Sequence, residues 1–260
     1  MNYQDLFSQQ PWHSEIQYAG QQFDWSPQGL DTLDNFKKHQ RQKENRKHLE
    51  ANGWLTHPGF KYRYNNFGFR GDDFTEAGLP MAFGASDVFG IGLPEDQIWI
   101  SRFSEISGQK IYNLGVPGGS CDTVYRLMTY WVDRILPKFV LVFWPPIFRY
   151  EVSKDNHTWE QMNIHTCVDD YNKNYFSNFI NSSVNSEKNL VAVCAICDRY
   201  NIPLYKLSSD HDMLYDHGAR DTYHPSKQAH EDLAKKFFEL YQQKKFINLQ
   251  NTTKISKEPS

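Results

Sequence analysis

Apolar residues gather into four short runs between residues 79 and 240, and more polar sequence separates them. Their length and their content of β-branched and aromatic residues are typical of buried strands. The predicted strands are residues 81–85, 110–114, 139–144 and 203–207. Helical patterns occupy residues 96–107, 122–136, 168–179, 187–200 and 225–243. This alternation predicts a parallel sheet with helices on both faces, with residues 81–85 in its centre between the next two strands.

The segment before the first strand is polar and aromatic, with little continuous apolar sequence. Residues 29–52 are predicted to form one helix, since Leu30, Leu33 and Phe36 have helical spacing and a charged, solvated face follows. Residues 60–74 alternate and contain Asn and Gly breaks, which indicates a short hairpin or an extended arm.

These patterns divide the chain into three parts. Residues 1–78 hold too few aliphatic side chains for a core of their own, so we expect an N-terminal arm that packs on a main domain of residues 79–247. The aromatic side chains of the arm either dock on that domain, which we favour, or stack on sugar rings. Residues 248–260 form a polar tail that we expect to be disordered.

Composition narrows the class of protein. The chain has 260 residues, 39% hydrophobic and 15% aromatic, with a formal net charge of −3. These values are unlike those of disordered chains and of general nucleic-acid binders. No apolar stretch has the length of a membrane span, and the first residues lack the pattern of a secretory signal, so we expect no membrane partner and a cytoplasmic location, or else a virion component.

The cysteines do not suggest a disulfide framework or a zinc site. Cys121, Cys167, Cys194 and Cys197 lack the spacing of either, and the last two lie in an apolar helical stretch, so we interpret them as core thiols. Residues 210–217 hold several Asp and His side chains that could bind a metal. We interpret that loop instead as the approach to the residues that follow it, and we expect no metal and no cofactor.

Candidate chemistry follows the ends of the predicted strands. In an open parallel sheet the active groups collect at the carboxyl ends of strands. Ser86 comes directly after the first strand, and the sequence D-T-Y-H, residues 221–224, follows the fourth. A serine hydroxyl needs a base, and the base needs an orienting group. Asp221 can orient His224, and His224 can activate Ser86. Taken alone, each motif is better explained by a structural Gly-rich turn or a chance surface pair, but their occurrence in this order, each after a strand, favours a Ser-His-Asp site.

Three segments resemble the sequence blocks of the SGNH/GDSL-type hydrolase family over about residues 64–238. They are F-G-A-S-D-V-F-G-I-G from residue 83, N-L-G-V-P-G-G-S from residue 113, and D-T-Y-H-P from residue 221, and N-N-F-G-F-R-G from residue 65 resembles the usual lead-in. The resemblance implies a flavodoxin-like three-layer α/β/α sandwich with a parallel sheet, preceded here by the N-terminal extension. It also implies Ser86 as nucleophile, His224 and Asp221 as its partners, and the backbone N–H groups of Ser86 and Gly118 as oxyanion donors.

The sequence departs from the family pattern in two places. Ala85 stands where the family has an aspartate beside the serine. The third block lacks its asparagine, the usual third oxyanion donor: P-P-I-F-R follows the strand at residues 139–144. We expect Trp144 or Arg149, which border this turn, to supply a compensating donor.

Two functions from different classes fit this sequence. The first is a serine ester hydrolase of SGNH type that acts on small acyl (acetyl) esters, with carbohydrate esters suggested by family analogy; an acyltransferase would use the same residues. The second is a catalytically weakened binding or structural module in a larger assembly, such as a viral one. The expected partner is a small-molecule or carbohydrate ester, with an oligomer or assembly partner left open.

Overall fold

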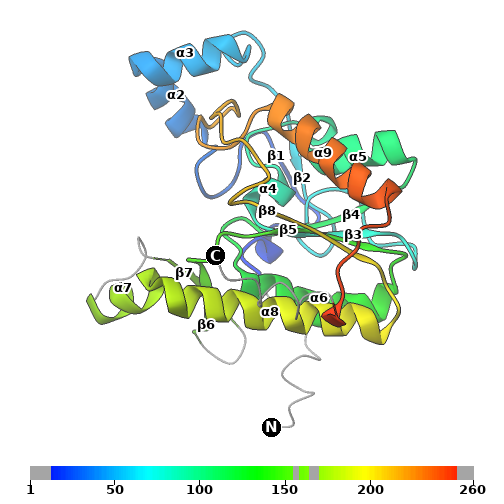
Figure 1. Ribbon diagram of the computed structural model, residues 1–260. Coiled ribbons are helices and arrows are strands. Elements are labelled where there is room, and N and C mark those ends of the chain that lie inside the picture. Colours follow the sequence, from blue (N-terminus) through cyan, green and yellow to red (C-terminus); the bar gives the residue numbers. More distant parts are fainter. Residues whose placement is uncertain (1–12, 155–157, 164–169, 251–260) are drawn as a thin grey trace.

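A parallel sheet of four strands forms the centre of the molecule (Figure 1). The computed structural model describes residues 13–154, 158–163 and 170–250. The sheet has the order β4-β3-β5-β8, and its strands are β3 (Met81–Gly84), β4 (Tyr112–Gly115), β5 (Val140–Trp144) and β8 (Leu204–Ser208). All neighbours are parallel, and β3 lies between β4 and β5. The predicted α/β class and the central place of the first strand are confirmed.

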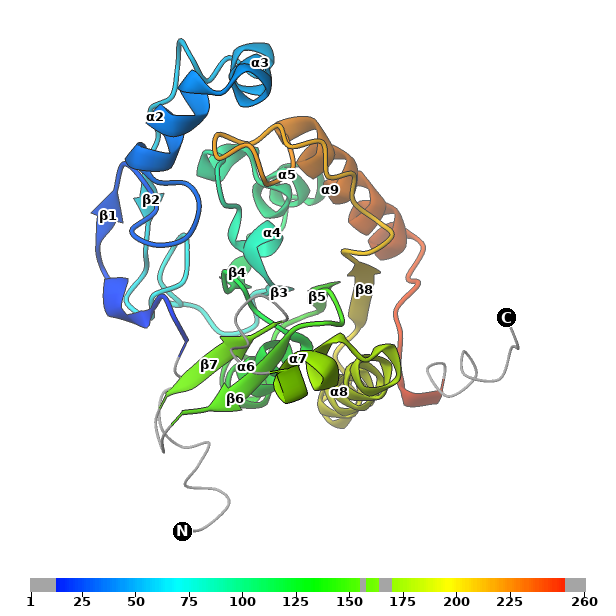
Figure 2. The ribbon, with the colours of Figure 1, turned by 90° about the vertical axis from the view of Figure 1, so that its left-hand side faces the viewer.

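Helices cover both faces of this sheet, as Figures 1 and 2 show. On one face lie α6 (Cys121–Ile135) and α8 (Phe179–Arg199); on the other lie α5 (Trp99–Ser107) and α9 (Lys227–Gln242). The strand side chains alternate between two cores. Met81 and Phe83 pack with the α6 and α8 side, whereas Ala82 packs with the α5 and α9 side. Both faces of the strands are therefore apolar, as the continuous hydrophobic runs predicted.

Short elements complete the main domain. α4 (Ser86–Phe89) follows β3 directly, and the 3₁₀ helix η2 (Glu95–Gln97) precedes α5. A two-stranded antiparallel hairpin, β6 (Tyr150–Ser153) and β7 (Trp159–Met162), follows β5, and α7 (Asp170–Ser177) precedes α8. The hairpin was not predicted, because its strands are short and only Tyr150 and Glu151 of them are buried, so they lack an apolar run.

The predicted helix at residues 187–200 begins too late. In the structure α8 starts at Phe179, where the Asn178 side chain accepts a hydrogen bond from the Asn181 amide and caps it. Two polar residues of α8, Ser182 and Asn189, are buried with polar partners. The Ser182 hydroxyl lies 2.8 Å from the Tyr150 hydroxyl, and the Asn189 amide donates to Asp122 at 2.7 Å.

The N-terminal segment lies along one side of the main domain (Figure 2). It contains the 3₁₀ helix η1 (Ile16–Tyr18) and two short antiparallel strands, β1 (Gln22–Phe23) and β2 (Tyr62–Arg63). The prediction of a single helix at residues 29–52 is wrong. Two helices, α2 (Leu33–Arg41) and α3 (Lys43–Ala51), meet at Gln42, whose backbone is extended.

This break has a physical cause in the distribution of apolar residues. Phe36 and Leu49 are buried, but Leu30 and Leu33 are each 41% exposed. The charged stretch between Phe36 and Leu49 has no apolar stripe that would hold one straight helix against the domain. In both views α2 and α3 lie at the outer end of the arm (Figures 1 and 2).

Three expectations concern features at the margins of the fold. Within the described ranges, no helix has the length and apolar character needed to span a bilayer. Cys121, Cys194 and Cys197 are buried in the core, and Cys167 lies outside the described residues. Most of the predicted tail also lies outside them, although Leu249, near its start, packs against the core.

Candidate active site

Ser86 is the first residue of α4, at the carboxyl end of the central strand. The turn between strand and helix is tight, and Ser86 is only 7% exposed. Gly115 at the end of β4 makes this position possible. A Cβ atom on Gly115 would lie 2.2 Å from the Phe89 nitrogen and 2.6 Å from the Val88 carbonyl carbon, so only glycine lets the strand approach the helix backbone this closely.

His224 and Asp221 lie together in the loop between β8 and α9. His224 Nδ1 is 2.5 Å from Asp221 Oδ2. The other carboxylate oxygen of Asp221 accepts the backbone N–H groups of Tyr223 and His224, each at 3.0 Å. Thr222, between these residues, has a φ of 62°, so the turn is held in a left-handed conformation. The carboxylate is thus fixed by the backbone and leaves one oxygen for the imidazole.

The surroundings of this pair determine its protonation. Burial lowers the pKa of His224, but the hydrogen bond and charge of Asp221 outweigh it, and the pKa is raised above 6.5. Burial raises the pKa of Asp221, and the hydrogen bonds from His224 and the backbone outweigh this, so the pKa is lowered. The negative charge of Asp221 therefore favours a protonated His224, which is the form that a general base takes after it accepts a proton.

Ser86 and His224 line the same cavity, which has a volume of about 820 Å³. The His224 side chain is 16% exposed, so a substrate can reach it. In the part of the chain that the structure describes, no hydrogen bond joins Ser86 Oγ to the His224 ring. The two groups nevertheless line one cavity. Catalytic hydrogen bonds are often longer or poorly aligned without substrate.

Gly118 and Arg149 also line this cavity. Gly118 has a φ of 74°, a conformation that favours glycine in the turn after β4. Arg149 Nη1 is buried and has no hydrogen-bond partner among the described residues. Trp144 does not line the cavity; its indole N–H donates to Ser186 at 2.9 Å, on the α8 side of the sheet. Of the two predicted compensating donors, Arg149 lines the cavity and Trp144 does not.

Sequence reasoning missed one charged group beside His224. Asp87 follows Ser86, and its Oδ2 accepts a hydrogen bond from the Tyr215 hydroxyl at 2.6 Å. Its Oδ1 is buried without a partner among the described residues, and its charge contributes to the raised pKa of His224. The aspartate next to the serine was visible in the sequence. Nothing there indicated that its carboxylate faces the loop of His224.

The remaining walls come from segments outside the parallel sheet. Gln28, Gly29 and Leu30 of the arm form one wall, and the β6–β7 hairpin forms another with Trp159 and Gln161. These contributions were not predicted, since the hairpin itself was not.

A buried ion pair fixes the hairpin to α6. Arg126 Nε donates to Glu151 Oε2 and Nη2 donates to Oε1, each at 2.7 Å. Gln161 donates to the same carboxylate at 2.9 Å, and the Arg126 guanidinium lies 5.1 Å from the centre of the Trp159 ring. Because this ion pair is bidentate, it fixes the position and orientation of the β6–β7 hairpin relative to α6.

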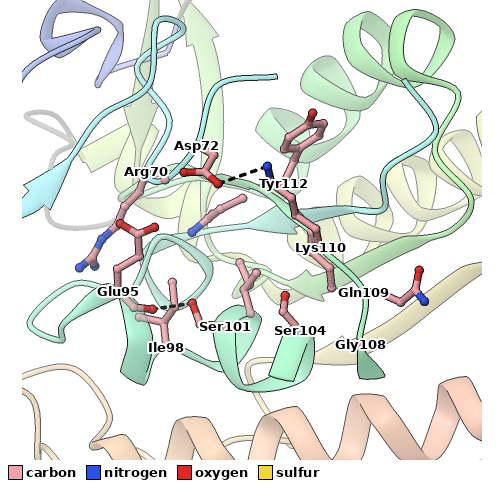
Figure 3. A pocket seen from close by; sticks show the side chains of 14 residues that line it. Arg70, Asp72, Glu95, Ile98, Ser101, Ser104, Gly108, Gln109, Lys110 and Tyr112 are labelled. Atoms are coloured by element: carbon pink, nitrogen blue, oxygen red, sulfur yellow. Dashed lines mark hydrogen bonds and ion pairs between the residues drawn. The ribbon is translucent and has the colours of Figure 1, made fainter. Parts of the chain in front are cut away.

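A second cavity, of about 400 Å³, lies beside the amino end of β4 (Figure 3). Its lining contains neither histidine nor cysteine. Lys110 Nζ lies 3.3 Å from the Asp72 carboxylate, and the Ser101 hydroxyl donates to the Glu95 carbonyl at 2.5 Å. The Ser101 hydroxyl is thus bonded to a carbonyl oxygen, and the lining offers no imidazole that could act as its base.

The acidic loop that could have bound a metal is held by other contacts. Asp212 accepts the backbone N–H of Ser208 at 2.8 Å, and Asp216 accepts the backbone N–H of Ser226 at 2.7 Å. Across the ranges 13–154, 158–163 and 170–250, no group of three His, Cys, Asp or Glu side chains is arranged to hold a metal ion. These carboxylates instead shape the loop that leads to His224.

No model of a known protein family matches the sequence, and no curated protein matches it. Solved structures of GDSL and SGNH hydrolases resemble its fold. The esterase EstA from Pseudoalteromonas sp. is 11% identical over 64% of this chain and 97% of its own, with a TM-score of 0.41. The SGNH-hydrolase family esterase AlinE4 is 16% identical over 64% and 75%, with a TM-score of 0.35. A lipolytic G-D-S-L family protein from Veillonella parvula DSM 2008 is 12% identical over 63% and 98%, with a TM-score of 0.38. At such low identities and TM-scores, function must be inferred from the site's own residues.

Proposed function

We propose that this protein is a serine ester hydrolase in which Ser86 is the nucleophile, His224 the general base and Asp221 the group that orients it. One observation carries the proposal: the Asp221–His224 pair, joined at 2.5 Å, faces the same cavity as a serine at the carboxyl end of the central strand. Three chemically matched groups come from two loops that follow different strands. This is where open parallel sheets place their active sites.

The reaction follows the usual course of acyl transfer to serine. His224 takes the proton of the Ser86 hydroxyl while Oγ attacks the ester carbonyl carbon. The tetrahedral intermediate collapses, the C–O bond to the alcohol breaks, and His224 returns the proton to the leaving oxygen. Water then attacks the acyl-serine with the same base, and the carboxylic acid and free serine result. Asp221 stays ionised and stabilises the imidazolium in both steps.

The negative charge that develops on the carbonyl oxygen needs fixed donors. The Ser86 N–H is a first-turn amide, which has no acceptor within its helix. With the Gly118 N–H it forms the proposed oxyanion site. Arg149 replaces the missing asparagine of the third block, which its cavity position and unpartnered buried Nη1 support. A guanidinium at this place adds a full positive charge.

The cavity supports a substrate larger than a simple acetyl ester. Its volume of about 820 Å³ exceeds what an acetyl group needs, and Trp159, Gln161 and Gln28 offer an aromatic face and amides. Such a lining suits an acyl group carried on a polar alcohol the size of a sugar. We therefore propose an O-acylated carbohydrate, or an alcohol of similar size and polarity, as the substrate class.

Hydrolysis of an aryl acetate by purified variants tests this proposal. Wild type is expected to hydrolyse it, and Ser86→Ala and His224→Ala to fall to the buffer rate. Arg149→Ala should lose on the order of 10²–10³ in kcat, the cost of one oxyanion donor. Ser101→Ala, in the second cavity, and His57→Ala, at the surface, are the controls and should keep full activity.

Equal hydrolysis rates in the wild type and all of these variants would contradict the proposal. It would leave the chain as a binding or structural module with the same fold. Loss in Ser86→Ala and His224→Ala, with Arg149→Ala unaffected, would keep the enzyme and exclude Arg149 from the oxyanion site.

A further inference from the structure

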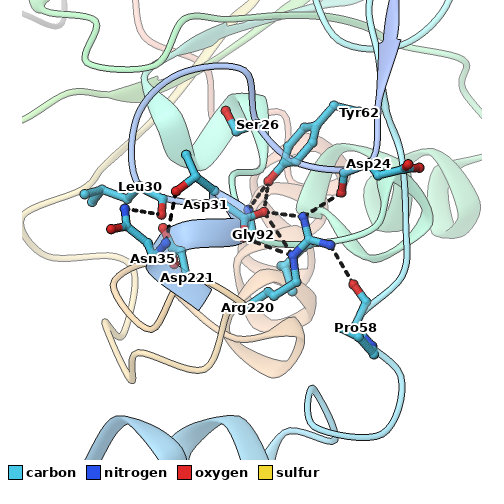
Figure 4. Close-up of polar contacts among 12 residues, drawn as sticks. Asp24, Ser26, Leu30, Asp31, Asn35, Pro58, Tyr62, Gly92, Arg220 and Asp221 are labelled. Atoms are coloured by element: carbon cyan, nitrogen blue, oxygen red, sulfur yellow. Dashed lines mark hydrogen bonds and ion pairs between the residues drawn. The ribbon is translucent and has the colours of Figure 1, made fainter. Parts of the chain in front are cut away.

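A closed circuit of hydrogen bonds joins the arm to both halves of the candidate active site (Figure 4). The Gly92 N–H donates to the Tyr62 hydroxyl at 2.7 Å, and that hydroxyl donates to the Asp31 carboxylate. Asp31 binds the Arg220 side chain, and the Arg220 backbone N–H donates to the Gly92 carbonyl at 3.0 Å. Asp31 and Tyr62 belong to the arm. Gly92 follows the helix of Ser86, and Arg220 precedes Asp221.

The Arg220 side chain is held entirely by the arm. Its Nη2 lies 2.7 Å from Asp31 Oδ2 and its Nε 3.0 Å from Oδ1, with both side chains at 0% exposure. Two further hydrogen bonds run to the backbone carbonyls of Pro58 at 2.6 Å and Asp24 at 3.1 Å. These contacts use the guanidinium N–H groups on every edge.

Aromatic rings complete the enclosure of this guanidinium. Its central carbon lies 3.8 Å from the ring centres of both Trp25 and Phe60, which also belong to the arm. A planar cation between two ring faces, with a bidentate carboxylate at its edge, is fixed in position and in orientation. The residue next to Asp221 therefore cannot move independently of the arm.

Gly92, just after the end of the Ser86 helix, also lies close to Asp221. A Cβ atom on Gly92 would lie 2.8 Å from the Ala219 Cβ and 3.3 Å from Asp221 Oδ1. Arg70, also in the arm, donates from Nη2 to the Leu93 carbonyl at 2.6 Å and from Nη1 to the Gly90 carbonyl. The turn that ends the Ser86 helix is thus clamped by the arm from one side and touches the Asp221 loop on the other.

We propose that Asp31 and Tyr62 are positioning residues of the active site. They fix the loop of Asp221 and His224 relative to the helix of Ser86, although neither touches a reacting atom. The inference rests on the proposed function. It makes the arm a working part of the site, beyond its contribution to the cavity wall. An error of about 1 Å in this register costs on the order of 10²-fold in rate.

The Tyr62→Phe variant tests this role most cleanly. It keeps the ring, which stacks against Phe89 with centres 6.1 Å apart, and removes only the hydroxyl that links Gly92 to Asp31. We expect kcat for the aryl ester to fall on the order of tenfold with KM changed by less than about twofold, since register and not substrate binding is affected. Asp31→Asn, which also weakens the hold on Arg220, should lose on the order of 100-fold.

Tyr112→Phe is the matched control. Tyr112 is another buried tyrosine whose hydroxyl accepts two backbone amides, those of Thr75 at 3.0 Å and Glu76 at 2.8 Å. It lies at the amino end of β4, whereas Ser86 lies at the carboxyl edge of the sheet. We expect a comparable loss of thermal stability and an unchanged kcat.

A proton spectrum separates this inference from the proposed function. The His224 Nδ1 proton, in its short hydrogen bond to Asp221, gives a resonance far downfield that can be assigned by its loss in His224→Ala. Tyr62→Phe should shift or broaden it, and Tyr112→Phe should leave it unchanged. If the wild-type protein proves inactive, the proposed function fails, and the resonance alone shows whether Tyr62 positions the Asp221–His224 pair.

An unchanged resonance in Tyr62→Phe would overturn the inference. A wild-type kcat in Tyr62→Phe, where the wild-type enzyme is active, would also overturn it. If Asp31→Asn does not fold, Tyr62→Phe still decides.

Discussion

At the scale of single residues, the protonation of His224 controls the proposed chemistry. The base must be neutral to accept the Ser86 proton, and its pKa in the folded protein lies above 6.5: burial lowers it, but Asp221 outweighs burial. Activity should therefore be complete above this raised pKa and should fall as the pH drops through it. Asp221→Asn removes the main cause of the raised pKa of His224, so the acidic limb of kcat/KM should move to lower pH while kcat itself drops. A pH–rate profile of both proteins measures this; a limb that stays in place would show that another group titrates.

The sequence was informative about the backbone position of the site residues and uninformative about their side-chain directions. Ser86, Asp221 and His224 could be predicted to lie at one edge of the sheet because each follows a strand of one parallel sheet, and strand ends meet there. Ser86 and His224 line one cavity, and Asp221 is buried beside His224. The direction of the Arg149 side chain could not be predicted, nor that of Trp144 into the core. Both residues flank the same turn. Arg149 lines the cavity, whereas Trp144 packs toward α8, and the sequence does not record this difference.

At the scale of elements, the approach of β4 to α4 is the contact that positions the nucleophile. Gly115→Ala places a methyl group 2.2 Å from the Phe89 nitrogen, so α4 must shift or the strand must part from β3. Overpacking of this kind costs about 1–3 kcal/mol of unfolding free energy, and the displaced Ser86 should lose most of its activity. Gly59→Ala, which meets nothing within 4 Å, is the control. Chemical unfolding and the ester assay check both variants. Equal stability and activity in the two would contradict this account of α4.

The errors in predicted elements have a common cause. The strands of the sheet and helices α5, α6 and α9 have continuous apolar signals, and their predicted positions agree with the structure to within a few residues. The β6–β7 hairpin and the first turns of α8 are held by polar contacts, and the break at Gln42 lies in a charged stretch without an apolar stripe. Hydrophobic periodicity does not record such contacts, because partners such as Arg126 and Glu151 are distant in sequence and of ordinary surface composition.

At the scale of the whole molecule, two buried histidines link folding to pH. Burial lowers the pKa of His13 to about 4 and that of His230 to about 3. The Trp99 backbone N–H donates to His230 Nδ1 at 3.1 Å, so a proton on Nδ1 would break this hydrogen bond. Both folded-state values lie below the unfolded value of about 6.5. The unfolded chain therefore binds more protons in this window, and stability is complete above pH 6.5 and lost as the pH falls toward 4 and then 3.

The His230→Asn variant tests this linkage, because the asparagine oxygen can still accept the Trp99 N–H. The dependence of unfolding free energy on pH between about 6 and 4 should decrease by about 1.4 kcal/mol per pH unit, the share of one histidine. His57→Gln, at the surface, should leave the dependence as it is. Denaturant unfolding at several pH values measures it, and an unchanged slope in His230→Asn would show that this histidine does not titrate in the window.

The contacts between the N-terminal arm and the main domain were only partly predictable from the sequence. Its low aliphatic content led us to expect docking, and the structure places Trp54 so that its indole N–H donates to the Gly218 carbonyl at 2.8 Å. The Asp31–Arg220 pair could not be foreseen, because 189 residues separate its partners and both types are usually exposed.

The central claim is that Ser86 is a nucleophile activated within this protein, and its reaction with a fluorophosphonate tests that claim most directly. Such a reagent phosphonylates an activated serine and spares ordinary hydroxyls. Intact mass and peptide mapping after incubation of wild type, Ser86→Ala, His224→Ala and Ser101→Ala give the result without any knowledge of the natural substrate. The account predicts one adduct on Ser86 in wild type and Ser101→Ala, none in Ser86→Ala, and a greatly slowed reaction in His224→Ala. A wild-type protein that stays unlabelled, or that is labelled equally in Ser86→Ala, would contradict it.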